Sequence, residues 1–140
     1  MTNVLVDSSA WIGFFRGEKS FVRVIDALLS EGSAAVTGPV LAEVSSGARN
    51  RSEFALLSQK LGALSWLDAP ENIWVLVAET RYTLARQGIQ AHLVDLVIAH
   101  IAHHGRCDLL TADRDFERIA NIVPIELIVI ERSKAPKVNS

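Results

Sequence analysis

The 140-residue sequence has little of several features that mark particular classes of protein. It has one cysteine, Cys107, so no disulfide framework can form, which fits a reducing cytoplasm. No apolar run is long enough to cross a bilayer, and the first residues, MTNVLVDSSAW, lack the features of a signal peptide. The net charge of −2 argues against binding nucleic acid through bulk positive charge alone. We therefore expect a cytoplasmic protein without a membrane segment.

What the sequence does contain is typical of a single globular domain. Hydrophobic residues make up 49% and charged residues 21%, which separates the chain from disordered sequences. A length of 140 residues favours one domain that can bury a core without disulfides or structural metals. We predict that this domain spans residues 1–132 and that residues 133–140 form a polar, flexible tail.

Short apolar runs alternate with segments of helical periodicity. Strands are predicted at 3–6, 33–37, 107–112 and in the second half of 122–131. Helices are predicted at 8–15, 20–32, 37–48, 52–64, 71–88, 91–105 and 115–121. This alternation indicates an α/β fold of three layers, α/β/α, around a central, mainly parallel sheet of four or five short strands.

Three acidic residues stand where the predicted strands end. Asp7 follows the first strand directly, and Asp113 follows the third strand after one alanine. Glu43 lies in the first or second turn of the helix after the second strand. The carboxyl ends of parallel strands share one edge of the sheet, where α/β proteins bind ligands. Each acid alone could equally be a turn former, a cap or a surface residue, so only their joint placement indicates a site.

A fourth acid, Asp95, interrupts HLVDLVIA, the most apolar predicted helix. Apolar residues surround it on nearly all sides, so we expect Asp95 to be at least partly buried. A buried carboxylate is unfavourable unless it is paired or bound to a metal. Asp95 is therefore harder than the other three acids to explain as a surface residue.

Carboxylates that converge at one edge repel one another, and this repulsion constrains their chemistry. At an effective dielectric constant of 20, two carboxylates about 4 Å apart cost roughly 4 kcal/mol. Mg²⁺ or Mn²⁺ would offset that repulsion, because hard divalent cations prefer oxygen ligands. Such a site suits hydrolysis of phosphodiesters, in which the metal lowers the pKa of a bound water.

Four segments together resemble a known family: NVLVDSSAWI, GPVLAEV, HLVDLVIAHIA and LLTADRDFERIA. In this order and spacing, over nearly the whole chain, they resemble the PIN domain and, more narrowly, the VapC-type ribonuclease toxins of bacterial toxin–antitoxin pairs. The resemblance implies an endoribonuclease with a Mg²⁺ or Mn²⁺ site. It assigns the catalytic acids as Asp7, Glu43, Asp95 and Asp113, of which Asp7, Asp95 and Asp113 bind the metal.

The resemblance also implies supporting residues around these acids. Thr111 would hydrogen-bond within the acidic cluster, and Ser8 stands next to Asp7. Asp115 matches an additional acid that supports the site less directly. Within LLTADRDF, Thr111 and Asp113 are two residues apart and face the same side of an extended chain. Asp115 lies where the chain turns, so we predict that it is the N-cap of the next helix.

Partners follow from the same resemblance. Such toxins cleave RNA, form homodimers, and are neutralised by a small antitoxin protein in a larger complex. The antitoxin's tail wraps the toxin and can insert a basic side chain into the acidic site. The aromatic residues Trp11, Phe14 and Phe15 would line that groove or belong to the core, with equal weight given to both readings.

Other functions are less well supported by the residues. A non-catalytic PIN-fold module that binds RNA or protein is the main alternative, although all four acids are present. A phosphoacceptor domain would need a second acid two residues after Asp7, where Ser9 stands. No Gly-x-Ser-x-Gly or glycine-rich phosphate loop appears. The histidines His100, His103 and His104 are predicted to form a solvated helix face. The sequence does not identify the RNA that is cleaved.

Overall fold

The computed structural model describes residues 3–132, so the predicted tail lies outside the described residues. A sheet of five parallel strands forms its centre, in the order β3-β2-β1-β4-β5. The strands are β1 (Val4–Val6), β2 (Ala34–Thr37), β3 (Ser65–Leu67), β4 (Asp108–Thr111) and β5 (Leu127–Val129). All residues of β1 and β2 are buried, as expected of short apolar strands covered on both faces.

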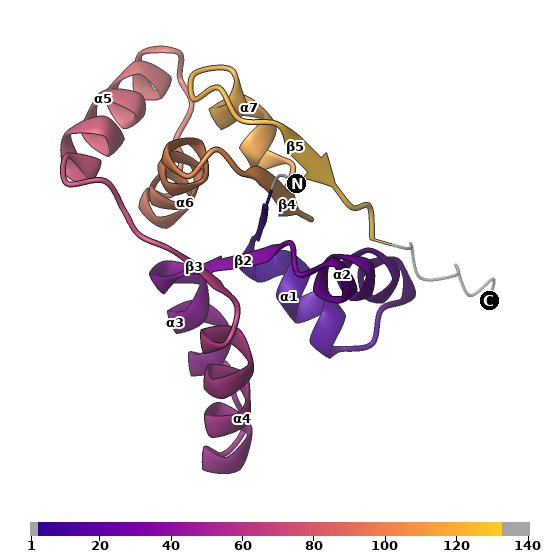
Figure 1. The fold of residues 1–140 in the computed structure, drawn as a ribbon. Helices are drawn as coiled ribbons and strands as arrows, with labels where there is room; N and C mark the ends of the chain where they lie inside the picture. The colour runs from indigo at the N-terminus through magenta and orange to yellow at the C-terminus, as the bar shows by residue number, and fades with distance from the viewer. Residues whose placement is uncertain (1–2, 133–140) are drawn as a thin grey trace, which may run out of the picture.

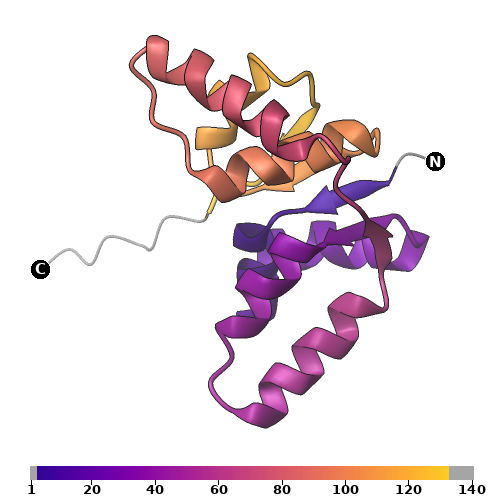
Figure 2. The ribbon, with the colours of Figure 1, turned by 90° about the vertical axis from the view of Figure 1, so that its left-hand side faces the viewer.

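Helices cover both faces of the sheet and complete the predicted three layers (Figures 1 and 2). One side carries α1 (Ser8–Phe15), α2 (Lys19–Glu31), α3 (Gly38–Ser46) and α4 (Arg51–Gly62). The other side carries α5 (Ile73–Arg86), α6 (Leu93–His104) and α7 (Asp115–Ala120). Helix α4 packs along α3 and projects away from the sheet (Figure 1). Within residues 3–132, none of the helices is both long and apolar enough to cross a membrane.

The α/β class and the four predicted strands are confirmed, and one strand was missed. Strand β3 has three residues, two of them exposed, and pairs in parallel only at the edge of the sheet. Trp66 in β3 is 48% exposed, so this segment shows neither an apolar run nor a buried face. It is a strand because its backbone extends the β2 ladder, and that tertiary contact is invisible in local sequence.

The strand order places a topological switch point between β1 and β4. The chain moves from β1 outward to β2 and β3, and then returns to build β4 and β5 on the other side of β1. Val6 is in register with Leu110, and the Asp7 N–H continues the ladder by donating to the Leu110 carbonyl at 2.8 Å. Residues that follow β1 and β4 therefore meet at the crevice where α/β sheets bind ligands.

A close contact between α1 and α2 leaves no room for a side chain at Gly13. A Cβ atom at Gly13 would lie 2.6 Å from the ring of Phe21, which is fully buried. We expect Gly13→Ala to lower the free energy of unfolding by roughly 1–3 kcal/mol, because overpacking forces the ring or the helix to move.

The matched control is Gly62→Ala in α4, where an added Cβ would meet no atom within 4 Å. That variant should gain slightly in stability, since alanine is the better helix former. Chemical denaturation of both variants measures the difference. Equal stability of Gly13→Ala and the wild type would contradict the packing described here.

Candidate functional site

Asp7 is the most buried of the four predicted acids, with 4% of its surface exposed. It occupies the N-cap position of α1, but its side chain makes no capping hydrogen bond. Instead, its Oδ2 accepts hydrogen bonds from the hydroxyls of Ser9 at 2.8 Å and Thr111 at 2.9 Å. The carboxylate therefore faces the end of β4 and does not cap its own helix.

Ser9 and Thr111 tie the loop after β4 to the start of α1. The Ala112 N–H donates to Ser9 Oγ, and the Asp113 N–H donates to Thr111 Oγ1, both at 3.0 Å. The two hydroxyl oxygens are 3.3 Å apart. The family resemblance pointed to Thr111, but nothing in the sequence placed Ser9 in the site, because its contact with Thr111 spans 102 positions of sequence.

The end of LLTADRDF is arranged differently from the prediction. Helix α7 begins with Asp115, its N-cap residue is Arg114, and no side chain caps it from that position. The predicted N-cap role of Asp115 is therefore wrong. The turn comes earlier, because Asp113 Oδ1 accepts the Asp115 N–H at 2.9 Å in an Asx-type turn. Asp113 is partly buried, whereas Asp115 is exposed.

Glu43 reaches the site from helix α3. Its Oε1 accepts a hydrogen bond from the Ser8 hydroxyl at 2.8 Å, which links α3 to α1 across 35 positions of sequence. The Ser8 side chain is buried and that of Glu43 is exposed. Ser8 thus holds Glu43 at the same edge as Asp7 while leaving the rest of its carboxylate open to solvent.

The pKa of Asp95 indicates that the four acids interact electrostatically. Its pKa is raised from 3.8 to about 6, first by burial and then by the negative charges of Asp7 and Asp113. Glu43 contributes in the same direction, and only His92 acts against it. Within residues 3–132, none of the ion pairs includes any of the four acids. The cluster therefore carries negative charge that is opposed by His92 but not neutralised by an ion pair within residues 3–132.

The first turn of α6 is less buried than the middle of that helix. Asp95 is partly buried as predicted, but Leu93 and Val94 are 43% and 40% exposed. From Leu96 to Ala102 the helix is buried on every side. Asp95 therefore lies at the boundary between the core and solvent, where a ligand can reach it.

The four acids share one edge but do not form a closed ligand shell. Within the described part of the chain, no three His, Cys, Asp or Glu side chains are close enough to hold a metal ion. Four like charges would be expected to stay apart in this way. Their donors are carboxylate oxygens, the ligand set that fits hard divalent cations, and Mg²⁺ usually keeps several waters. The residues present fit such an ion through an open site.

The raised pKa of Asp95 predicts how stability changes with pH in metal-free buffer. The folded state binds the Asp95 proton more tightly than the unfolded state does. Protonation of Asp95 therefore stabilises the fold, and this contribution to the free energy of unfolding is complete below about pH 4. That contribution is lost as pH rises to about 6. Because Asp95 is partly exposed, we expect a loss of only about 1 kcal/mol.

Melting curves of the wild type and Asp95→Asn in a chelating buffer between pH 4 and pH 7 measure this contribution. The wild type should lose stability relative to the variant as pH rises. Parallel curves for the two proteins would show that the environment of Asp95 has been misjudged.

Two other expectations about side chains can be compared with the structure. Of the two roles left open for Trp11, the structure supports the core, because Trp11 is buried and packs against Phe14 and Phe15. Phe15 remains 37% exposed and lines a groove. The prediction for His100 was wrong. His100 is also buried, and its Nε2 lies 2.7 Å from Thr80 Oγ1 in the α5–α6 contact. Its polar ring was assigned to solvent, but the hydroxyl of the neighbouring helix satisfies it. His103 and His104 are exposed as predicted.

Comparison with known proteins agrees with this geometry. Residues 4–122 match the PIN domain family. Ribonuclease VapC21 of Mycobacterium tuberculosis is 31% identical over 134 residues, which cover 91% of this chain and 95% of that protein. Ribonuclease VapC11 of the same organism is 30% identical over 128 residues, which cover 88% of this chain and 96% of that protein.

A solved structure shows the same fold at lower sequence similarity. VapBC2 from Rickettsia felis, bound to a DNA fragment from its promoter, superposes with a TM-score of 0.75 at 20% identity. The match covers 91% of this chain and 98% of that chain. This chain therefore shares its overall fold with that structure.

Proposed function

Because this chain belongs to the PIN domain family, within which VapC ribonucleases are its relatives, we propose that it is the endoribonuclease toxin of a type II toxin–antitoxin system. It hydrolyses phosphodiester bonds in RNA, in the cytoplasm, with the help of a divalent metal ion. The observation that carries this proposal is that acids from four segments come together at the switch point of the sheet. Asp7 accepts a hydrogen bond from the Thr111 hydroxyl, which in turn accepts the Asp113 N–H. Asp95 lies near enough for the charges of Asp7 and Asp113 to raise its pKa, and none of the ion pairs within residues 3–132 includes these acids.

The metal that fits these residues best is Mg²⁺ or Mn²⁺. Asp7, Asp95 and Asp113 offer only oxygen atoms, and thiolate or imidazole ligands are not needed. When bound, such an ion orients the phosphate, lowers the pKa of a water molecule and stabilises the leaving oxygen. We assign these three aspartates as metal ligands and Glu43 as the fourth catalytic acid.

The surrounding hydroxyls position these acids. Ser9 and Thr111 hold the Asp7 carboxylate by its Oδ2, which leaves Oδ1 free. Ser8 holds Glu43 by one oxygen in the same way. Asp113 is fixed through its own N–H and through the turn that its Oδ1 closes. Asp7, Glu43 and Asp113 therefore each have an oriented side chain and one carboxylate oxygen outside these hydrogen bonds.

The partner that we propose is a small antitoxin that binds beside the acids. A groove next to Glu43 is lined by apolar Ile12, Phe15 and Leu57 and by the charged residues Arg16 and Arg49. A peptide with aliphatic anchors and an arginine directed at the acids suits such a surface.

A homodimer is part of the same proposal. Helix α5 and the start of α6 expose Trp74 by 65%, Tyr82 by 64% and Leu93 by 43%. Large apolar side chains gathered on one face mark an interaction surface. Sedimentation of the purified chain measures its mass, and a monomer at all concentrations would contradict the dimer.

Cleavage by the purified chain tests the ribonuclease proposal. We expect it to cut single-stranded loops of RNA with Mg²⁺ or Mn²⁺, to stop in excess chelator and to resume when metal is restored. Cleavage that persists in chelator would count against the metal site. Absence of cleavage across a broad RNA pool would favour the non-catalytic alternative.

Growth of cells tests the partner. Expression of this chain alone should stop growth, and co-expression with the neighbouring reading frame should restore it and give a complex that co-purifies. Equal toxicity in both cases would contradict the antitoxin proposal.

A further inference from the structure

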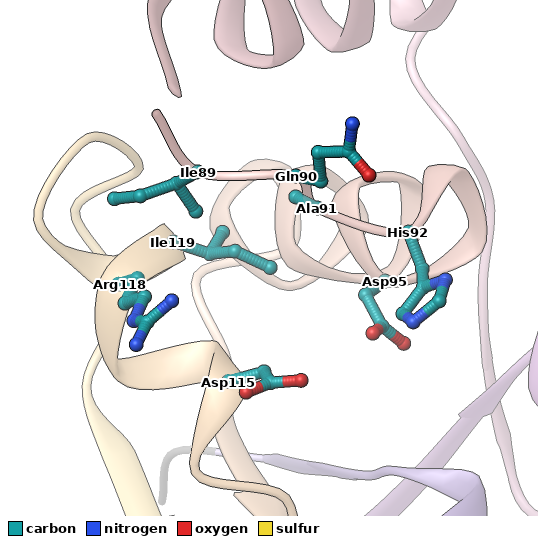
Figure 3. A pocket seen from close by; sticks show the side chains of 8 residues that line it. All are labelled: Ile89, Gln90, Ala91, His92, Asp95, Asp115, Arg118 and Ile119. Atoms are coloured by element: carbon teal, nitrogen blue, oxygen red, sulfur yellow. The ribbon is translucent and has the colours of Figure 1, made fainter. Parts of the chain in front are cut away.

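A small pocket of about 80 Å³ lies immediately beside Asp95. One wall is the linker 89–92 between α5 and α6, together with Asp95, and the other is helix α7 with Asp115, Arg118 and Ile119. Figure 3 shows His92 and Asp95 side by side on one wall, with Asp115 and Arg118 across from them. The pocket therefore opens next to the acids that we assign to catalysis.

The polar side chains around this pocket are not used by the fold. In the described part of the chain, no hydrogen bond or ion pair involves the side chain of Gln90, His92 or Arg118. All three are exposed, as is Asp115, whose backbone N–H but not its carboxylate is hydrogen-bonded. The Arg118 guanidinium and the Asp115 carboxylate lie on one wall and are available to a ligand.

The linker also has backbone groups, in Gln90 and Ala91, that form no backbone hydrogen bonds within residues 3–132. The Ile89 N–H donates to the Leu84 carbonyl, and the His92 carbonyl accepts the Leu96 N–H. Among backbone hydrogen bonds within residues 3–132, none uses the N–H or carbonyl groups of Gln90 and Ala91. The segment belongs to no helix or strand, so it can present these groups to a planar ligand as a strand presents them to a neighbour.

The chemistry of the pocket favours a base over a phosphate. Ile89 and Ile119 provide apolar surface for the face of a ring, and the polar groups surround it. A second phosphate would lie against the carboxylates of Asp95 and Asp115, which repel it. A neutral base that donates to a carboxylate and accepts from a guanidinium meets no such repulsion. Unstacked bases of single-stranded RNA are recognised by proteins in this way.

We propose that this pocket binds one unstacked guanine base of the RNA, next to the phosphodiester that is cut, and that Arg118 recognises it. Guanine offers two acceptors, O6 and N7, to the planar fork of an arginine, and its N1–H and N2–H groups can donate to Asp115. This inference rests on the proposed ribonuclease function. It assigns Arg118 as a residue that determines specificity.

The test uses hairpin RNAs that differ only at one position of a single-stranded loop. Initial rates give kcat/KM for the four RNAs with the wild type, Arg118→Lys and Arg118→Ala, in Mn²⁺. Lysine keeps the charge but loses the planar fork, so it separates recognition of a base edge from attraction to a phosphate. Arg23→Ala, an exposed residue of α2, is the matched control.

We expect the wild type to prefer guanine at one loop position. Arg118→Lys should lower kcat/KM for the guanine RNA by about tenfold, and change the other three by less than about twofold. The control should keep the wild-type preference. A uniform loss for all four RNAs in Arg118→Ala with full activity in Arg118→Lys would show a phosphate contact and overturn the proposal. The proposal would also be overturned if Arg118→Lys kept the wild-type preference for guanine, or if the wild type preferred another base.

Binding of the same RNAs in chelating buffer, followed by fluorescence anisotropy, separates this inference from the ribonuclease proposal. The wild type should bind the guanine RNA more tightly than the other three, and Arg118→Lys should lose this preference. That result would support guanine recognition by the pocket even if the protein cleaves no RNA. Equal binding of all four RNAs by the wild type would overturn it. An effect of Arg118→Lys on antitoxin binding alone would assign the pocket to the antitoxin and likewise overturn it.

Discussion

Asp95→Asn is expected to reduce RNA cleavage by at least about a hundredfold while leaving the fold intact. Asparagine has the same shape but lacks the charge that would bind a divalent metal. Asp95 is the acid whose pKa is raised by the charges of the other three, so it is electrostatically coupled to all of them. The loss should appear in kcat for any RNA that the wild type cuts.

The same substitution should make the metal-free protein more stable, by about 1 kcal/mol near neutral pH. It removes a partly buried charge and the repulsion from Asp7 and Asp113. Asp26→Asn in α2 is the control, because it also removes one negative charge but from an exposed position. A strong loss of stability in Asp95→Asn would mean that Asp95 is a structural hydrogen-bonding residue.

Asp7→Ala is expected to abolish cleavage to a similar extent and, unlike Asp95→Asn, to destabilise the protein. The Asp7 carboxylate accepts two hydroxyl hydrogen bonds in a buried site, and alanine would leave Ser9 and Thr111 without that acceptor. Hydrogen bonds to a charged group contribute roughly 1.5–3 kcal/mol, so we expect a net loss of about 2 kcal/mol after the relief of repulsion. Denaturation in chelating buffer measures it.

Asp7→Asn is the companion variant, because its amide oxygen can still accept from both hydroxyls. It should remain nearly as stable as the wild type but lose cleavage. A stable Asp7→Ala would contradict the hydrogen-bond network, and an active Asp7→Asn would contradict the metal role of Asp7.

The sequence was sufficient to predict the fold class and the position of Asp7 and Asp113 at strand ends for one physical reason. Short strands buried on both faces need apolar residues, so polar residues such as Asp7 and Asp113 are visible where each strand ends. Their meeting at one edge then follows from parallel pairing, which the structure confirms. The resemblance to the family supported the same residues independently.

What the sequence could not predict depends on contacts between distant segments. Strand β3 exists through its pairing with β2, and Ser9 joins the site through atoms more than a hundred positions away. Helix α4 begins at Arg51 rather than at the predicted position 52, because the Asn50 side chain caps it by accepting the Glu53 N–H. Asp115 was assigned as a cap because the pattern of residues cannot distinguish which of two neighbouring aspartates closes a turn.

If the four acids form one metal site, binding of Mn²⁺ must depend on Asp95, and titration with Mn²⁺ followed by electron paramagnetic resonance measures that dependence. The wild type should bind Mn²⁺, Asp95→Asn should bind it at least about tenfold more weakly, and Asp26→Asn should match the wild type. Equal Mn²⁺ affinity in the wild type and Asp95→Asn would show that the acids do not form a shared metal site.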